Sequence, residues 1–286
     1  MIQSMTGFGK ATLQLPTKKI TVEVKSLNSK GLDLNTRMPS VYREMELGLR
    51  NEIALKLERG KIDFSIYIEI TGEQTSSKIN APIVKAYIKQ MQEVIPNADE
   101  TELMKMAVRM PDALKTERDE IDENDWAEIQ KVIKEALDNI GNFRQDEGKS
   151  LEKEFQLRIG NIRQYMNDAL ALDPERVQAI KDRLQTAISE LKVNVDENRF
   201  EQELIYYLEK LDITEEKVRL TIHLDYFIET IKGKDANGRK LGFITQEMGR
   251  EINTMGSKAN HAQMQKLVVM MKDELEKIKE QVLNVL

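Results

Sequence analysis

The chain has 286 residues, of which 40% are hydrophobic and 32% are charged, so it can bury a sizeable core in one large or two modest domains. It contains no cysteine and only two histidines, which excludes disulfide bonds and thiolate metal sites and leaves too few ligands for an ordinary structural zinc site. Its net charge of −6 argues against a general basic coat for nucleic acid, although a local basic patch is compatible with it.

The N-terminal part, residues 1–72, has the two-residue periodicity of strands. Apolar and polar residues alternate in KKITVEVKSLN (18–28), GLDLNTRMP (31–39) and KIDFSIYIEI (61–70), which predicts half-buried strands. The intervening segment 41–61 repeats apolar residues at spacings of four and is ended by Gly60, which predicts a helix. The order strand, strand, strand, helix, strand favours a small mixed or antiparallel sheet with a helix on one face.

From residue 80 onward the periodicity is helical almost to the C-terminus, so we expect an α+β protein whose second domain (80–286) consists of long helices. No apolar stretch approaches the ~20 residues of a membrane span, and the N-terminus lacks a charged segment followed by an apolar one; we expect a cytoplasmic protein. The predicted helices begin near Pro82, with a short one inside the acidic stretch 96–125, and then span 126–142, 144–172, 174–193, 197–211, 214–232, 239–258 and 259–285.

The helix expected over residues 239–258 has three separate faces when its side chains are projected at about 100° per residue. Gly242, Gly249 and Gly256, seven residues apart, line one side. Each interior glycine costs a helix roughly 1 kcal/mol, which suggests that another backbone packs closely there. An apolar stripe lies next to the glycines. The opposite side is the charged stripe, formed by Lys240, Glu247, Arg250, Glu251, Thr254 and Lys258.

The charged stripe has two interpretations. It can be a solvated face held together by weak pairs such as Glu247 with Arg250. It can also be the wall of a groove, because the other two sides of the helix are suited to packing. In a groove, the cations Lys240, Arg250 and Lys258 can hold phosphates. Glu247 and Glu251, one turn apart, can then ligate a hard divalent ion such as Mg²⁺ or Mn²⁺.

The preceding helix carries a second cluster, in DITEEKVRLTIHLDYF. Glu216, Arg219 and His223 share one face at spacings of three and four. A histidine beside a carboxylate can serve as a general acid or base near neutral pH, or it can simply be a structural histidine tied to Glu216. The short turn GKDANG makes the two helices antiparallel neighbours. Counting outward from that turn puts His223 and Glu247 at similar height along a helical hairpin, 212–258.

Six segments of the chain resemble signature segments of the bacterial YicC/YloC-like family: SMTGFGK, VEVKSLNSKGLDLNTRMP, RGKIDFSIYIE, FRQDEGKSL, DITEEKVRLTIHL and GRKLGFITQEMGREINTMGSKAN. They follow the family's order from the first residue to the last, and the final segment is the most specific. The resemblance implies a stress- or stationary-phase-associated endoribonuclease that depends on a divalent metal. It also implies subunits assembled into a hexamer with a channel that accommodates RNA.

Matching positions transfer the family's pattern to particular residues of this sequence. This sequence departs from the family's pattern at Gly242, where the family usually has an acidic residue, and at Gly249, where the family usually has asparagine. The catalytic candidates are His223, Glu247, Glu251 and Arg250. The candidate metal ligands are Glu247, Glu251, Glu216 and Asp212. The candidate RNA-binding residues are Lys25, Asn28, Lys30, Arg37, Arg59, Lys61, Arg219, Arg239, Lys240 and Lys258.

We expect RNA to enter between the sheet domain and the C-terminal helices and to be cleaved with a divalent ion, Mn²⁺ or Mg²⁺, and with His223 as acid or base. Attack by water and attack by the 2′-hydroxyl are both open, and an arrangement with two histidines would need His261 as well. Two other functions fit the same residues. One is a noncatalytic RNA-binding or adaptor protein, and the other is a structural oligomer whose C-terminal helices pack between subunits.

Overall fold

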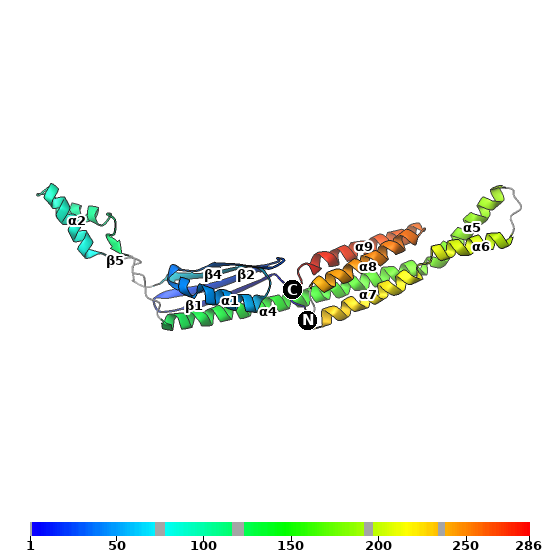
Figure 1. Ribbon diagram of the computed structural model, residues 1–286, viewed down its shortest axis with the longest axis horizontal. Helices are drawn as coiled ribbons and strands as arrows, with labels where there is room; N and C mark the ends of the chain where they lie inside the picture. The colour runs from blue at the N-terminus through cyan, green and yellow to red at the C-terminus, as the bar shows by residue number, and fades with distance from the viewer. Residues whose placement is uncertain (1, 72–77, 116–122, 192–196, 234–237) are drawn as a thin grey trace.

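The computed structural model describes residues 2–71, 78–115, 123–191, 197–233 and 238–286. The molecule is elongated (Figure 1): a small sheet built from N-terminal residues lies beside a row of long helices, and a short helical projection forms each end. The predicted α+β class is therefore confirmed.

The sheet has four strands in the order β1-β2-β4-β3, with β3 parallel to β4 and the other pairs antiparallel. Helix α1 connects β3 to β4, so the predicted order of elements is confirmed. One face of the sheet is apolar and buried, through Val22 and Val24 of β2 and Phe64 of β4. The elements are β1 (Gly7–Gln14), β2 (Lys18–Leu27), β3 (Leu32–Arg37), a 3₁₀ turn (Ser40–Met45), α1 (Glu46–Leu57) and β4 (Gly60–Ile70).

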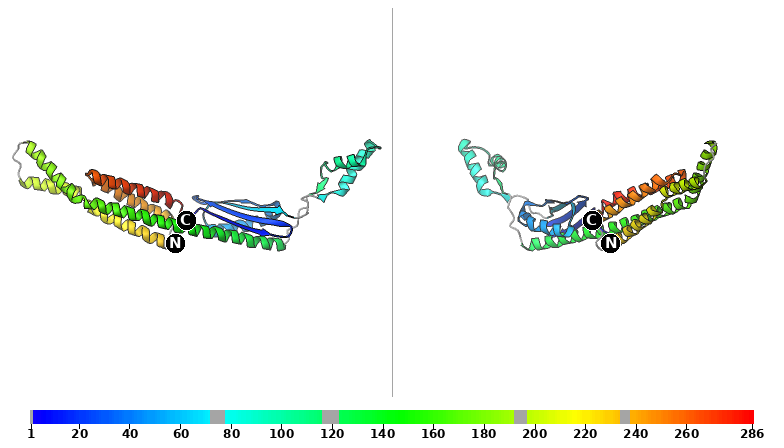
Figure 2. Two further views of the ribbon diagram at one scale, coloured as in Figure 1. Left: turned by 180° about the vertical axis from the view of Figure 1, so that it is seen from behind. Right: turned by 45° about the vertical axis from the view of Figure 1, so that its right-hand side comes forward.

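One helix of 49 residues, α4 (Glu123–Ala171), runs along both halves of the molecule (Figure 2). The predicted break near residue 143 is wrong. The segment contains no proline, and a Cβ at Gly141 would meet no atom within 4 Å, so this glycine marks neither a turn nor a close contact. The first half of α4 packs residues such as Ile133 on the sheet, and the second half packs residues such as Phe155 against the C-terminal helices. The same helix therefore belongs to both cores.

Two glycines allow α4 and the N-terminal segment to approach closely. A Cβ at Gly9 of β1 would lie 2.1 Å from the backbone oxygen of Ala136, and a Cβ at Gly148 of α4 would lie 2.2 Å from the backbone oxygen of Ile2. Because backbone atoms cannot move aside as a flexible side chain can, any larger residue would push the two segments apart. The first residues of the chain and β1 therefore lie directly against α4.

Arg144 is buried at this joint, with 2% of its surface exposed. Burial lowers the pKa of its guanidinium group. The group donates hydrogen bonds to the hydroxyl of Ser26 and to the backbone oxygens of Met5, Leu57 and Arg59. A single side chain of α4 therefore ties together the N-terminal segment, β2 and the turn before β4.

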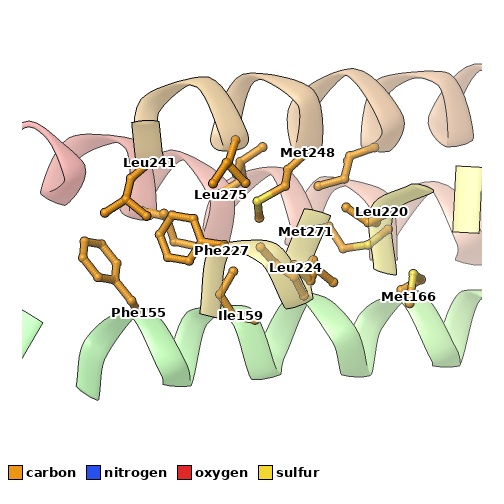
Figure 3. Close-up of a cluster of buried hydrophobic side chains, with 14 of the residues drawn as sticks. Phe155, Ile159, Met166, Leu220, Leu224, Phe227, Leu241, Met248, Met271 and Leu275 are labelled. Atoms are coloured by element: carbon orange, nitrogen blue, oxygen red, sulfur yellow. The ribbon is translucent and has the colours of Figure 1, made fainter. Parts of the chain in front are cut away.

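The C-terminal helices pack with the second half of α4 around the core seen in Figure 3. Phe155 of α4 meets Phe227 of α7 edge to face, with 5.4 Å between ring centroids. Leu241 and Met248 of α8 and Leu275 of α9 are buried in the same cluster. This cluster includes the apolar stripe that the sequence predicts for the helix 239–258. The helices are α7 (Thr214–Lys232), α8 (Gly238–Lys258) and α9 (Ala262–Val282).

Two projections complete the chain (Figure 1). One is built on a small cluster that includes Val84 and Ala107, and the other is a pair of helices. No helix in the described segments is both long and apolar enough to cross a membrane. The division into domains 1–72 and 80–286 stays a prediction. The first projection comprises β5 (Lys78–Ile79), α2 (Ala81–Val94), α3 (Glu100–Ala107) and β6 (Leu114–Lys115), and the second comprises α5 (Asp173–Leu191) and α6 (Glu197–Lys210).

Replacing Gly9 with alanine should destabilise the protein by at least about 2 kcal/mol, because the new methyl group collides with the backbone of α4. The matched control is Gly141→Ala on α4, where the space around the Cβ is open. It should stabilise the fold by about 0.5–1 kcal/mol through helix propensity alone. Urea denaturation followed by circular dichroism measures both changes. Equal effects of the two substitutions would contradict the close contact at Gly9.

Candidate functional site

Helices α7 and α8 lie side by side, and two contacts between them fix their antiparallel register. At one end, the Lys240 ammonium group lies 4.9 Å from the centroid of the Tyr226 ring. At the other end, Lys258 Nζ donates to Glu216 Oε1 at 2.7 Å. Between these contacts ten residues of α7 run beside eighteen residues of α8, and His223 and Glu247 both lie in this interval.

The row of polar and charged side chains along α7 and α8 between and around these contacts is here termed the α7–α8 seam. It contains Asp212, Glu216, Arg219, His223 and Tyr226 on one side and Lys240, Glu247, Arg250, Glu251 and Lys258 on the other. The charged stripe of α8 thus lies beside α7. It does not lie on the side of α8 that faces away from every packed helix. The fully exposed side of α8 is a third face, next to the stripe.

Lys258 balances the negative charge at one end of the seam. Its ammonium group bonds Glu216, which is 5% exposed, and also donates to the backbone oxygen of Asp212 at 2.9 Å. The Asp212 carboxylate accepts hydrogen bonds from the hydroxyl and backbone N–H groups of Thr214, and the hydroxyl bond in particular lowers the pKa of Asp212. Both carboxylates therefore already have cationic or hydrogen-bonding partners.

Glu216 nevertheless has spare capacity, because its second oxygen, Oε2, is buried without a hydrogen-bond partner in the described part of the chain. A buried oxygen of this kind is costly unless a polar group approaches it. The oxygen adjoins the seam, so this end of the seam is suited to a polar or cationic ligand.

The middle of the seam holds the acid–base candidates. His223 is half-buried on α7. On α8, the Glu247 side chain is 50% exposed and lies 4.0 Å from the Arg250 guanidinium group, whose side chain is 77% exposed. Such an exposed pair stabilises a helix by no more than about 0.5 kcal/mol, so both charges are available to a ligand. Glu251 is 6% exposed, and its carboxylate makes no hydrogen bond or ion pair within the described residues.

The four predicted metal ligands do not form one cluster. Across the described ranges, no group of three or more carboxylate or imidazole side chains is placed to hold a metal ion. Asp212 and Glu216 are occupied by Thr214 and Lys258, whereas Glu247 and Glu251 follow one another by a single turn. A pair of carboxylates is enough for a Mg²⁺ or Mn²⁺ ion, which needs one or two carboxylates when phosphate oxygens and water complete its shell.

At two of the three glycines the structure shows close side chains, where the spacing predicts a close backbone. A Cβ at Gly256 would lie 2.9 Å from Val268 of α9, and one at Gly249 would lie 3.3 Å from Leu275, so these two glycines permit the packing of α9. Gly242 differs, since a Cβ there would meet nothing within 4 Å. Its place is the wall of a pocket.

That pocket, of ≈720 Å³, lies between the end of the sheet and the beginning of α8, with the end of α9 as its third wall. Asn28 closes one side by donating from its amide to the backbone oxygen of Leu283 at 2.7 Å. Arg59 donates from Nε to the backbone oxygen of Ser29 at 2.9 Å, which orders the adjoining loop. Four of the predicted RNA-binding residues line the pocket: Asn28, Lys30, Arg59 and Arg239.

The contribution of α9 to this pocket was not predicted from the sequence. Lys279 lines it together with Glu276 and Glu280, and Lys279 pairs with Glu276 at 3.2 Å. In the sequence these charges form an ordinary amphipathic pattern. Only the approach of the sheet loops to the end of α9 distinguishes them.

The other predicted RNA-binding residues lie elsewhere. Lys25 and Lys61 are on the open face of the sheet, where register pairs them with Asp63 and Asp33, and Arg37 ends the neighbouring strand β3. Those three are thus separate from the pocket. The remainder, Arg219, Lys240 and Lys258, belong to the seam, and Arg219 also pairs with Glu215.

His261 is not in the seam. It precedes α9, where its Nδ1 accepts a hydrogen bond from the backbone N–H of Met264 at 3.4 Å. An arrangement of two catalytic histidines is therefore absent from the α7–α8 seam as the described residues define it.

Comparisons with known proteins cover nearly the whole chain. A family described as "Endoribonuclease YicC-like, N-terminal region" matches residues 2–153, and one described as "Endoribonuclease YicC-like, C-terminal" matches residues 170–286. The chain belongs to the YicC-like endoribonuclease family. The first match contains the pocket residues of the sheet together with Arg144, and the second contains the α7–α8 seam.

Two relatives in this family match end to end. A protein named probable endoribonuclease YicC from Clostridioides difficile (strain 630) is 33% identical over 293 residues, which covers 100% of both chains. A protein of the same name from Haemophilus influenzae (strain ATCC 51907 / DSM 11121 / KW20 / Rd) is 29% identical over 287 residues, with 99% of each chain covered. The residues matched by these relatives thus include those of the pocket and of the seam.

Replacing Lys258 with methionine should destabilise the protein by roughly 2 kcal/mol, because it leaves the Glu216 carboxylate buried without its counter-charge. Adding Glu216→Gln to Lys258→Met should restore part of that loss, since a neutral amide needs no counter-charge. The control Lys266→Met, on the exposed side of α9, should change stability by less than about 0.5 kcal/mol. Thermal unfolding measures all three; a loss that Glu216→Gln deepens would refute the pairing.

Proposed function

We propose that this chain cleaves RNA internally at the α7–α8 seam, with His223 and Glu247 as its acid and base. The observation that carries the proposal is the register of the two helices, set by Tyr226 with Lys240 and by Glu216 with Lys258. It brings a half-buried imidazole level with a carboxylate that has no strong partner. Groups of this kind transfer protons near neutral pH.

Cleavage of a phosphodiester requires two proton transfers, which these groups can perform. One group removes the proton from the attacking hydroxyl, which is either water or the 2′-hydroxyl of the RNA. The attacking oxygen forms a bond to phosphorus while the bond from phosphorus to the leaving oxygen breaks. The second group gives a proton to that leaving oxygen, so no charge accumulates on it.

The cations of the seam stabilise the negative charge that develops on the phosphate. Arg250 is well placed for this role because its guanidinium group is exposed beside Glu247 and can bind two phosphate oxygens together. Glu247 and Glu251 would hold a Mg²⁺ or Mn²⁺ ion, and such an ion would neutralise phosphate charge when bound. Cleavage in this proposal depends on a divalent ion, and Asp212 and Glu216 are not among the ligands of that ion.

RNA reaches the seam from the pocket. Lys30 and Arg59 line the pocket from the sheet side and Arg239 from α8, and Lys240 follows directly on the seam side. These cations form a path around the beginning of α8, along which a phosphate backbone can be held. The path accounts for RNA entry between the sheet and the C-terminal helices.

Assembly into a hexamer, a cytoplasmic location and a role in RNA turnover or stress form part of the same proposal. They are supported by the family resemblance and by nothing in the single chain. The noncatalytic adaptor and the structural oligomer are the outcomes that the following experiment separates from cleavage.

Purified protein should cleave an end-labelled RNA, and His223→Ala and Glu247→Gln should each slow cleavage by about 10²- to 10⁴-fold because one proton transfer is lost. The control is Glu229→Gln, an exposed carboxylate of α7 outside the seam, which should cleave at the original rate. Rates are compared with Mn²⁺, with Mg²⁺ and with EDTA, and the product ends separate attack by water from attack by the 2′-hydroxyl.

Binding without cleavage under every metal condition would reject the nuclease and leave the adaptor. Neither binding nor cleavage would leave the structural oligomer. If both variants cleave normally while folded, the catalytic assignment fails even though the activity stands.

Removing a pocket cation should weaken RNA binding in a salt-dependent way. For Lys30→Ala, the slope of log K against log salt concentration should fall by about 0.7, the value for one phosphate contact with a single strand. Lys61→Ala, on the open face of the sheet, is the matched control and should leave the slope unchanged. Fluorescence anisotropy across a salt series measures both slopes, and the reverse result would move the RNA path to the sheet face.

A further inference from the structure

Two aromatic rings at one end of the α7–α8 seam are exposed although the adjacent core is filled. Phe243 of α8 is 62% exposed and Tyr226 of α7 is 44% exposed. Neither ring belongs to the buried cluster that contains Phe227 and Leu241. Leaving a phenylalanine largely in water forgoes roughly 1–2 kcal/mol of burial, so an exposed ring next to a candidate site suggests a ligand.

Each of the two rings can be placed relative to Lys240. Tyr226 is located by the contact with Lys240, whose ammonium group lies 4.9 Å from its centroid. Phe243 follows Lys240 by three residues and precedes Glu247 by four, so all three lie along one side of α8. Tyr226 and Phe243 are therefore each about one helical turn, or roughly 5.4 Å along the helix axis, from His223 and Glu247 respectively.

We propose that Phe243 and Tyr226 form a stacking platform for an unpaired nucleobase beside the phosphate that is cleaved. This inference rests on the proposed function and assigns the base next to the cleaved phosphate to Phe243 and Tyr226. A base inside a duplex is covered on both faces by its neighbours, so it has no face to offer to an aromatic side chain.

The charges around the rings favour RNA over an apolar partner. Phe243 lies between Lys240 and Arg250 on α8, and Arg239 adjoins Lys240. Surfaces that bind single-stranded nucleic acid combine these two features, cations that follow the backbone and aromatic rings on which bases stack. A face that docks another protein is instead depleted of charge at its centre.

The exposed apolar residues of α7 differ from this platform. Val218 and Ile222 are 51% and 58% exposed, and they are aliphatic, so they offer no ring to a base. Their positions continue the stripe that ends at Tyr226. A second copy of the chain covering that stripe is the competing explanation for the exposure of Tyr226, and it is one outcome of the test.

The test uses single-stranded RNA that carries 2-aminopurine, a base whose fluorescence is quenched by stacking, at successive positions. Phe243→Leu should weaken binding about 10-fold and abolish the quenching at one position, because leucine keeps apolar surface but has no ring. Phe243→Trp should retain both. Phe143→Leu is the matched control, since Phe143 is an exposed phenylalanine of α4 outside the seam, and it should behave as the unmodified chain does.

Normal binding and quenching by Phe243→Leu would overturn the platform, even if the unmodified chain cleaves RNA. So would an unchanged RNA affinity together with weakened self-association in analytical ultracentrifugation, which would identify a protein-docking face. Quenching that depends on Phe243 in a protein that binds but never cleaves RNA would support the platform while refuting the proposed cleavage.

Discussion

The fold depends on the close contact between α4 and the N-terminal segment. Gly9 and Gly148 let backbones approach where a Cβ would lie little more than 2 Å from an opposing oxygen. Arg144 then bonds three carbonyl groups and a hydroxyl across that contact. Because α4 also supplies Phe155 to the second core, the joint connects the sheet to the core of the C-terminal helices. One of its acceptors is the backbone of Arg59, which lines the pocket.

The charges of the seam are arranged so that its two ends differ. At one end, Lys258 compensates Glu216, which stabilises two helices that would otherwise bury an unpaired carboxylate. In the middle, Glu247 and Arg250 form a pair too long and too exposed to contribute much to stability. Charged groups that contribute little to folding are the ones a substrate can use. The buried pair thus holds the helices in register, and the exposed pair is left for chemistry.

Much of this arrangement could be predicted from sequence because it follows local periodicity. The alternation of apolar and polar residues around Val22 and Val24 predicted the strands. The short segment GKDANG predicted that His223 and Glu247 lie at similar height along the hairpin. The break expected near residue 143 failed because a glycine inside a long helix is tolerated when both flanking segments are buried against other elements. The expected close packing at Gly242 was wrong, because helical spacing identifies the residues on one side of a helix but not the element that packs there.

Other features could not be read from sequence because they depend on contacts between distant segments. Arg144 bonds mainly to backbone carbonyl groups, which have no signature in the sequence. The pocket requires the loop at Asn28 to meet the end of α9, more than two hundred residues away. The pairing of Glu216 with Lys258 likewise depends on which side chains reach across the seam. It reduces the proposed metal ligands from four carboxylates to two.

Photo-crosslinking tests most directly whether RNA occupies the α7–α8 seam. A single-stranded RNA with 4-thiouridine at defined positions is irradiated on the intact protein in EDTA, and the crosslinked peptides are identified by mass spectrometry. Crosslinks should fall on α7 and α8 between Arg219 and Arg250, together with the pocket residue Lys30. Crosslinks confined to the open face of the sheet, around Lys25 and Lys61, with none on α7 or α8, would contradict the account.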